Sequence, residues 1–311
     1  MSTCAACGKG GDGLKACTGC DQVKYCNGAC RKAHWQKHKK QCRQQQVDTM
    51  RIISECTKKF DSIVISDNEL FKDPPPKEEC PICLLPMPHA SGACGVYKGY
   101  QPCCGKRICV GCMHGAKDEM NKGNIKGCCP FCRKPIGGSG EEYLERCKKR
   151  MMANDIYAIN MLGETYGNGF HGTPQNYIKA LEFWFQAAKL GSLDAHNSIA
   201  NAYFNGDGID KDKEKAIHHW EIAAIGGHEP ARHNLAIYEG YKGQHERAMK
   251  HFMIAAKSGY DSLKEVGEGY KRGDVSKDEY AMTLRAYKDS MDEMKSDHRT
   301  KAEAAMAHRV L

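Results

Sequence analysis

Apolar residues recur with helical spacing through the second half of the chain, and the same pattern returns four times. The stretches "AINMLGETYGNGF", "AHNSIANAYFNGDGI", "ARHNLAIYEGYKG" and "SLKEVGEGYKRGD" begin 37, 36 and 31 residues apart. Each is followed by a second apolar pattern: "KALEFWFQAAKLG", "KAIHHWEIAAIGG", "RAMKHFMIAAKSG" and a weaker "YAMTLRAYKDS". A period in the mid-thirties with two helices per unit predicts a solenoid of antiparallel helical hairpins.

The residues inside each unit indicate how the hairpins pack. Trp184, Trp220 and Phe252 share one register and small alanines share another, so these aromatic side chains are expected in the core between closely spaced helices. Glycine clusters after each first helix suit a helix C-terminus. In the first unit, Thr173 is predicted to cap the second helix, with Pro174 as its first residue.

These units resemble Sel1-like repeats, which share the pattern "LGxxYxxGxG…KAxxWxxxAAxxG". We count three good copies and a degenerate fourth within residues 141–290. The resemblance implies an all-α solenoid with an extended face for protein substrates or adaptors. The tail, residues 291–311, is predicted to form a charged helix or a frayed cap.

Cysteine usage separates the first half of the chain from the second. The chain has 19 cysteines, mostly in CxxC pairs, and none after residue 147. The N-terminus lacks the hydrophobic stretch of a signal peptide, and no run of 18 apolar residues predicts a membrane span. Paired thiols in such a chain are typical of metal ligands in a reducing compartment, so we expect a cytoplasmic or nuclear protein.

The first cysteine cluster supplies eight metal ligands within residues 1–46. They are Cys4, Cys7, Cys17, Cys20, Cys26, Cys30, His38 and Cys42. Eight ligands predict two closed tetrahedral zinc sites, which are structural because no position is left for a reactive water. Since about 40 residues bury too little core to fold alone, zinc would supply the missing stability.

The stretches "CAAC", "CTGC", "KYC" and "CRKAHWQKHKKQC" resemble a MYND finger. The resemblance implies that Cys4, Cys7, Cys26 and Cys30 share one zinc ion, and that Cys17, Cys20, His38 and Cys42 share the other. His34 is the rival of His38 as a ligand. The family binds proline-rich peptides, and Trp35 falls in its peptide-groove region, although Arg31 stands where the family often has glutamine.

Residues 47–76 are predicted to connect two modules. They combine a partial helical pattern with a stiff "DPPPK" segment.

A second cluster, within residues 77–140, again supplies eight ligands. They are Cys80, Cys83, Cys103, Cys104, Cys109, Cys112, Cys129 and Cys132. The run "CCGKRICVGC" resembles part of a RING finger, which normally has a histidine where Lys106 stands. An ammonium group cannot bind zinc, so Cys103 is expected to replace that ligand. Adjacent Cys103 and Cys104 require a sharp turn that Gly105 allows. Cys94 and Cys128 remain as alternatives.

The stretches "CPIC", "CCGKRICVGC" and "CPFCRKP" resemble the all-cysteine RING subclass. The resemblance implies a cross-brace, with Cys80, Cys83, Cys109 and Cys112 on one zinc ion and Cys103, Cys104, Cys129 and Cys132 on another. It also implies that Ile82, Pro130 and Arg133 contact a ubiquitin-conjugating enzyme. The expected fold is therefore multidomain: two zinc-stabilised cross-brace modules followed by an all-α solenoid.

The expected function is that of a RING-type ubiquitin ligase, and the alternative is a non-catalytic zinc-binding scaffold. The formal charge of +8 suggests nucleic acid as a third partner. Binding four Zn²⁺ through 15 thiolates would lower this charge to about +1. Nucleic-acid binding is therefore the least favoured function.

Overall fold

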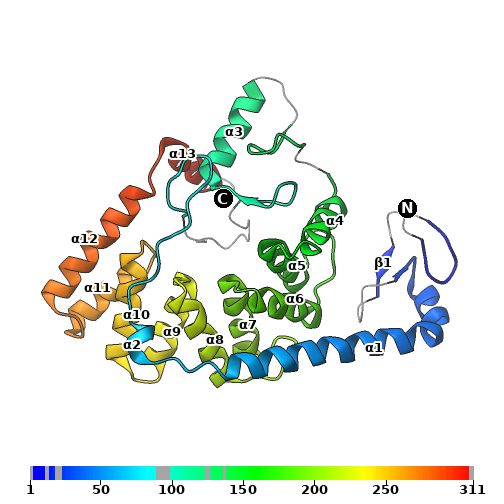
Figure 1. Ribbon diagram of the computed structural model, residues 1–311, viewed down its shortest axis with the longest axis horizontal. Coiled ribbons are helices and arrows are strands. Elements are labelled where there is room, and N and C mark those ends of the chain that lie inside the picture. Colours follow the sequence, from blue (N-terminus) through cyan, green and yellow to red (C-terminus); the bar gives the residue numbers. More distant parts are fainter. Residues whose placement is uncertain are drawn as a thin grey trace. The chain divides into compact units, whose positions relative to one another are not determined.

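The computed structural model describes residues 3–10, 14–17, 23–88, 99–122, 127–135 and 138–307. These residues fold into two compact units, Met1–Ile63 with Ser139–Lys213 and Val64–Gly138 with Glu214–Leu311. Each unit combines one cysteine-rich segment with part of the helical repeat (Figure 1). No helix in the described part of the chain is both long and apolar enough to span a bilayer.

The first unit begins with a two-stranded antiparallel sheet, β1 (Lys15–Ala16) and β2 (Lys24–Tyr25). A long helix follows, α1 (Gly28–Asp61), which Asn27 caps by accepting a hydrogen bond from the amide of Cys30. The helix crosses the predicted boundary at residue 46 without a break, so the helical pattern of residues 47–61 extends the finger's own helix.

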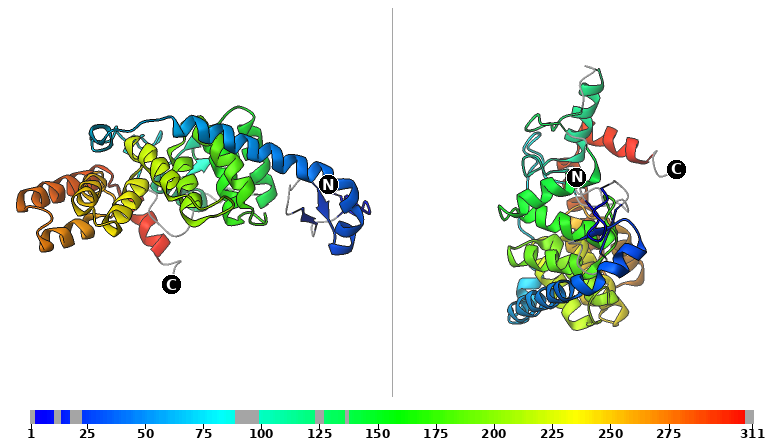
Figure 2. Two further views of the ribbon diagram at one scale, coloured as in Figure 1. Left: turned by 90° about the horizontal axis from the view of Figure 1, so that it is seen from below. Right: turned by 90° about the vertical axis from the view of Figure 1, so that its right-hand side faces the viewer.

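Four helices complete the first unit: α4 (Gly140–Met151), α5 (Ile156–Asn168), α6 (Tyr177–Lys189) and α7 (Leu193–Asn205). Helix α1 packs against α6, and Figure 2 shows it in blue beside the green repeat helices. The Thr49 hydroxyl donates to the Glu182 carboxylate at 3.0 Å, and the Phe60 ring stacks on Phe185 with centroids 6.4 Å apart. These contacts attach the zinc finger to the first repeat within one unit.

The repeat pattern produces hairpins because each helix has local start and stop signals. Helix α5 starts at a cap in which Asp155 accepts from the amide of Ala158, and it ends at Gly169 with φ +70°. In the hairpin of α5 and α6, Trp184 packs on two glycines of α5. A Cβ at Gly163 or Gly167 would lie 2.4 or 2.9 Å from the indole, so this close packing requires glycine.

One predicted helix start is wrong. Helix α6 begins at Tyr177, and its cap is Asn176, whose side chain accepts a hydrogen bond from the amide of Lys179. The Thr173 hydroxyl instead donates to the carbonyl oxygen of Phe170 at 2.7 Å. Asparagine caps a helix N-terminus at least as well as threonine does, and here the helix begins after Asn176, three residues beyond Thr173.

The second unit contains the second cysteine-rich segment and the later repeats. After α2 (Asp67–Leu70) come the antiparallel strands β3 (Tyr100–Gln101) and β4 (Lys106–Arg107), then α3 (Val110–Lys122). The repeat helices are α8 (Lys213–Ile225), α9 (Glu229–Tyr241), α10 (His245–Lys257), α11 (Leu263–Arg272) and α12 (Lys277–Glu293), and α13 (Asp297–Ala307) follows. The degenerate fourth repeat thus forms the helix pair α11 and α12.

The segment around α2 lies on the later repeats. Leu70 is buried, and its carbonyl oxygen accepts a hydrogen bond from the fully buried Arg232 of α9 at 2.8 Å. A second guanidinium nitrogen of Arg232 donates to the carbonyl oxygen of Ala224 at 2.7 Å. Burial lowers the pKa of Arg232 to about 10, so the side chain stays charged at neutral pH.

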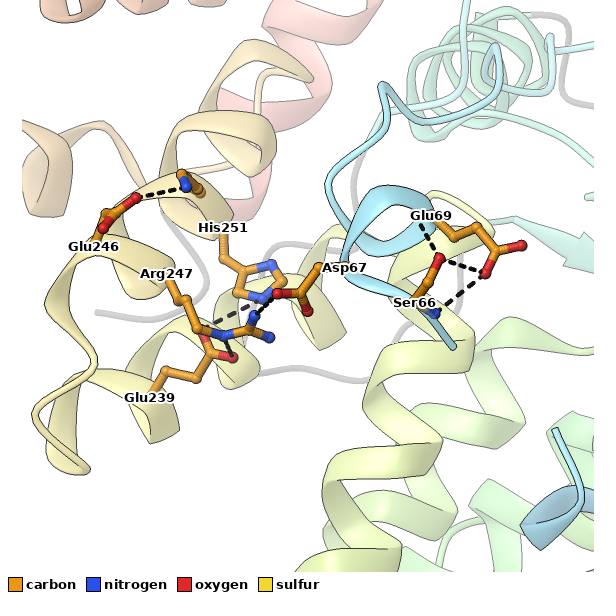
Figure 3. Close-up of polar contacts among 8 residues, drawn as sticks. Ser66, Asp67, Glu69, Glu239, Glu246, Arg247 and His251 are labelled. Atoms are coloured by element: carbon orange, nitrogen blue, oxygen red, sulfur yellow. Dashed lines mark hydrogen bonds and ion pairs between the residues drawn. The ribbon is translucent and has the colours of Figure 1, made fainter. Parts of the chain in front are cut away.

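A polar network fastens the start of α2 to the same surface (Figure 3). Arg247 of α10 donates to Asp67 at 2.6 Å and to Glu239 at 2.9 Å. The fully buried His251 lies 3.5 Å from Glu239, and its ring is 4.7 Å from the ring of Phe71. Residues 67–71 of the predicted connector are therefore packed on the later repeats.

Candidate metal centres

Among the described residues, the structure gathers side chains able to bind a metal ion into four clusters, within each of which the candidate ligand atoms all lie within 4.8 Å of one another. Site A is Cys4, Cys7, Cys26 and Cys30; site B is Cys17, His38 and Cys42; site C is Cys80, Cys83, Cys109 and Cys112; site D is Cys103, Cys104, Cys129 and Cys132. Cys20, the fourth ligand expected at site B, lies outside the described residues.

Three of the sites are built on the same turn of the backbone. In each, the amide four residues after the first cysteine donates to that cysteine's carbonyl oxygen: Gly8 to Cys4 at 2.9 Å, Leu84 to Cys80 at 2.8 Å, and Arg133 to Cys129 at 2.9 Å. All three donors have a left-handed conformation, with φ of +72°, +56° and +61°. The CxxC spacing therefore folds into three copies of one backbone turn, called a knuckle below, that brings two cysteine side chains together.

The distances between sulfur atoms fit a zinc ion and exclude disulfides. Neighbouring sulfurs are 3.7 Å apart between Cys83 and Cys109 in site C, and 3.8 Å apart between Cys104 and Cys129 in site D. A tetrahedral zinc ion with bonds of about 2.3 Å separates its sulfur ligands by about 3.8 Å. A disulfide needs about 2.05 Å.

The electrostatics of site A suit a cation among its four sulfur atoms. A backbone hydrogen bond from Cys26 lowers the pKa of the Cys4 thiol to about 6. The sulfur contact with Cys26 raises the pKa of Cys30 to about 12. Once one thiolate has formed, its neighbours resist ionisation unless a cation offsets the charge, which is the role of a divalent metal ion.

The two histidines of the first module have different surroundings. His38 is buried in site B, and burial lowers its pKa, which favours the neutral imidazole that binds metal. His34 pairs its Nδ1 with the Tyr25 hydroxyl at 2.9 Å. Trp35 is half-buried on the cysteine core of this module, and its ring meets His38 edge-on with centroids 6.2 Å apart.

The structure also places the alternatives for site D. Cys103 joins the site, with its sulfur 3.5 Å from that of Cys132, and Gly105 makes the adjacent turn with φ +73°. The half-buried Cys128 is not part of this cluster, and Cys94 lies outside the described residues. Lys106 lies on β4 with its ammonium 5.6 Å from the Phe131 ring centroid.

The residues implied as contacts for a conjugating enzyme lie on the knuckles of sites C and D. Ile82 is 42% exposed, Pro130 is half-buried and Arg133 is exposed. Sequence reasoning missed Phe131, which stands inside "CPFC" and is 44% exposed. Its place in the knuckle of site D, next to Pro130, is the sequence feature that points to it.

Comparison with known families identifies two of the modules. The family model described as MYND finger matches residues 4–42, and the Sel1 repeat model matches residues 156–192, 193–228 and 230–260. The chain therefore carries a small N-terminal zinc finger followed by a helical Sel1-repeat solenoid, which supports zinc binding and a protein-interaction role. Neither matched family includes residues 77–140.

Similar proteins share only parts of the chain. Chitin synthase regulatory factor 4 of Schizosaccharomyces pombe is 31% identical over 105 residues, which is 33% of this chain and 17% of that protein. A protective antigen of uropathogenic Escherichia coli with an SLR fold is 26% identical, with a TM-score of 0.41 over 49% of this chain and 33% of the other. A Sel1 repeat protein from Oxalobacter formigenes is 18% identical, with a TM-score of 0.45 over 68% and 89%.

Proposed function

We propose that the protein is a RING-type ubiquitin ligase of the cytoplasm or nucleus, in which sites A to D hold one zinc ion each. The supporting observation is the order of the ligands in the second module. The first and third cysteine pairs meet at site C, and the second and fourth pairs meet at site D. This interleaving is the cross-brace that the resemblance to a RING implies, and α3 begins directly within its third pair.

Exposed side chains on the two knuckles supply a surface for a conjugating enzyme. Ile82 and Phe131 each leave more than two-fifths of their surface exposed, one on the knuckle of site C and one on that of site D. Exposed apolar side chains on rigid, metal-held loops are typical of a protein-interaction surface. Pro130 stiffens the second loop beside Phe131.

Arg133 provides a second argument for this surface. It occupies the left-handed position of its knuckle, where Gly8 stands in the equivalent turn of the first module. A left-handed conformation costs a residue with a Cβ about 1–2 kcal/mol, and glycine avoids that cost. Leu84 has the same conformation in the knuckle of site C, so both knuckles of the second module hold a side chain at this strained position. The planar fork of Arg133 is able to bridge a conjugating enzyme and ubiquitin by several hydrogen bonds.

The proposed reaction takes place on the conjugating enzyme. A substrate lysine amine attacks the ubiquitin thioester, an amide bond forms, and the enzyme's thiol leaves, so the ligase itself forms no covalent bond. The second module positions the charged enzyme. The Sel1 repeats and the MYND finger hold substrates or adaptors, with proline-rich peptides as the class expected near Trp35.

A non-catalytic scaffold is the second candidate. The name of the Schizosaccharomyces pombe relative assigns a regulatory role to that protein, and a MYND finger with Sel1 repeats suits the assembly of partners without any transfer reaction. In a scaffold, the second module would bind zinc and proteins but no conjugating enzyme.

A discharge assay separates the two candidates. Zinc-loaded protein is mixed with a panel of ubiquitin-charged conjugating enzymes and free lysine, and loss of the thioester is followed. We expect faster discharge with at least one enzyme, and loss of this effect in Ile82→Ala and Arg133→Ala. Val64→Ala and Arg285→Ala, at exposed positions of the same unit, serve as matched controls. Four bound zinc ions without discharge across the panel would leave the scaffold.

A further inference from the structure

We propose that Arg299 of α13 is an outer-sphere residue of site C, so that the C-terminal helix completes this metal centre. The inference rests on zinc occupancy of site C, as proposed above, and does not depend on ligase activity. Sequence reasoning predicts a charged helix or frayed cap for residues 291–311. The structure forms helix α13 within this tail and packs it against α3 (Figure 1).

The guanidinium of Arg299 contacts the first knuckle at several points. The side chain is buried, with only 5% of the residue exposed. One terminal nitrogen lies 3.5 Å from the sulfur of Cys83 and 3.4 Å from the carbonyl oxygen of Leu85. The other donates to the carbonyl oxygens of Pro86 at 2.8 Å and Met294 at 2.7 Å. One cation therefore holds both a metal-ligating sulfur and the loop that follows it.

Two glycines of α3 make this approach possible. A Cβ on Gly111 would lie 2.5 Å from Cγ and 2.7 Å from the backbone nitrogen of Arg299. A Cβ on Gly115, one turn later, would lie 3.0 Å from the His298 ring. Only glycine at residue 111 leaves room for the arginine, so the docking of α13 depends on a residue between two ligands of site C, Cys109 and Cys112.

The charge of the site gives the guanidinium its function. Zinc with four thiolates carries a formal charge of −2, and burying that charge without compensation is costly. A guanidinium beside one sulfur offsets part of the charge and forms a charge-assisted hydrogen bond, which would hold the sulfur in place on the metal. Outer-sphere partners of this kind typically change metal affinity by about 10–100-fold.

The test measures zinc release from the full chain. Wild type, Arg299→Met, Arg299→Lys and the control Arg285→Met are loaded with zinc and counted for metal. Excess chromogenic chelator is then added, and the release of each ion is timed. We expect four ions in every protein and release of one ion about 10–100-fold faster in Arg299→Met. Arg299→Lys, which keeps the charge, should fall between the two.

Alkylation of the thiols shows which site opens. Under chelator, modification of Cys83 should accelerate in Arg299→Met, while modification of Cys132 in site D keeps its wild-type rate. Gly111→Ala, which displaces α13 without changing the arginine, should also accelerate Cys83.

Three outcomes are distinguishable. Fewer than four ions in the wild type would remove the premise of occupied sites. Four ions with unchanged release in Arg299→Met would overturn the role of Arg299. If Arg299→Lys releases its ion as fast as Arg299→Met, the positive charge does not protect the site and the electrostatic role is refuted.

Discussion

Replacing Arg232 by methionine should detach the connector segment from the later repeats. The buried guanidinium donates to the carbonyl oxygens of Leu70 and Ala224. The Ala224 carbonyl also accepts from the amide of Gly227 at 3.0 Å, so it keeps a partner in the variant. The Leu70 carbonyl loses the bond that Arg232 provides. An unsatisfied buried acceptor costs about 1–3 kcal/mol.

Two further effects enter the estimate. Methionine has a similar length and fills much of the space, so little cavity cost is added. The variant also no longer has to desolvate a buried guanidinium. The free energy recovered in this way offsets the loss of the hydrogen bond to Ala224. The net effect is about 1–3 kcal/mol, which favours opening of the segment by about 5- to 150-fold.

Hydrogen exchange measures this opening directly. The amides of Leu70 and Phe71 are bonded within the segment, to the carbonyl oxygens of Ser66 and Asp67, and should exchange about 5- to 150-fold faster in Arg232→Met. Arg285→Met, an exposed position on α12, is the control and should leave both amides unchanged. If Arg232→Met exchanges at the wild-type rate while the helices remain folded, the buried arginine does not hold the segment.

Three other predictions follow from particular contacts. Burial lowers the pKa of His251, so near pH 6.5 the histidine takes up a proton in the unfolded chain while it stays neutral in the folded one. The free energy of unfolding should therefore fall by up to about 1.4 kcal/mol per pH unit below that pH. Urea titrations between pH 7 and 5.5 should find this slope reduced in His251→Leu. Gly163→Ala should destabilise the first unit by about 1–3 kcal/mol through collision with Trp184, whereas Gly28→Ala at the start of α1, where a Cβ meets nothing within 4 Å, should leave the urea midpoint nearly unchanged. A strong zinc chelator should unfold the cysteine-rich modules while circular dichroism retains the signal of the repeat helices, since those helices hold their core without metal ligands; complete loss of helical signal would contradict this.

The sequence predicts the repeat helices and the cysteine clusters because their signals are local. A CxxC pair defines its own turn, and an apolar pattern with glycine stops defines a helix, whatever the rest of the chain does. The sequence predicts Thr173 as the cap of α6 and the structure uses Asn176, because both residue types are suitable caps and they lie within three residues of each other. Local preference alone does not choose between them.

The packing of α13 on site C and of residues 67–71 on the later repeats is not predictable from such local signals. Arg299 meets Cys83 across 216 residues, and Arg232 meets Leu70 across 162. In the sequence, each is one charged residue on a helix, like many that face water. Only the three-dimensional packing shows that these two arginines are buried.

The continuous helix α1 fixes both the distance and the rotation of the zinc finger relative to the first repeat. Cys42 belongs to site B and Thr49 contacts α6 of the same unit, and helical geometry places them about 10 Å apart along the axis. Each inserted residue between them would advance the finger by about 1.5 Å and turn it by about 100°. Insertions of seven residues nearly restore its direction. Length variation in this stretch should therefore be tolerated in steps of two helical turns, because other steps present a different side of the finger to its partners.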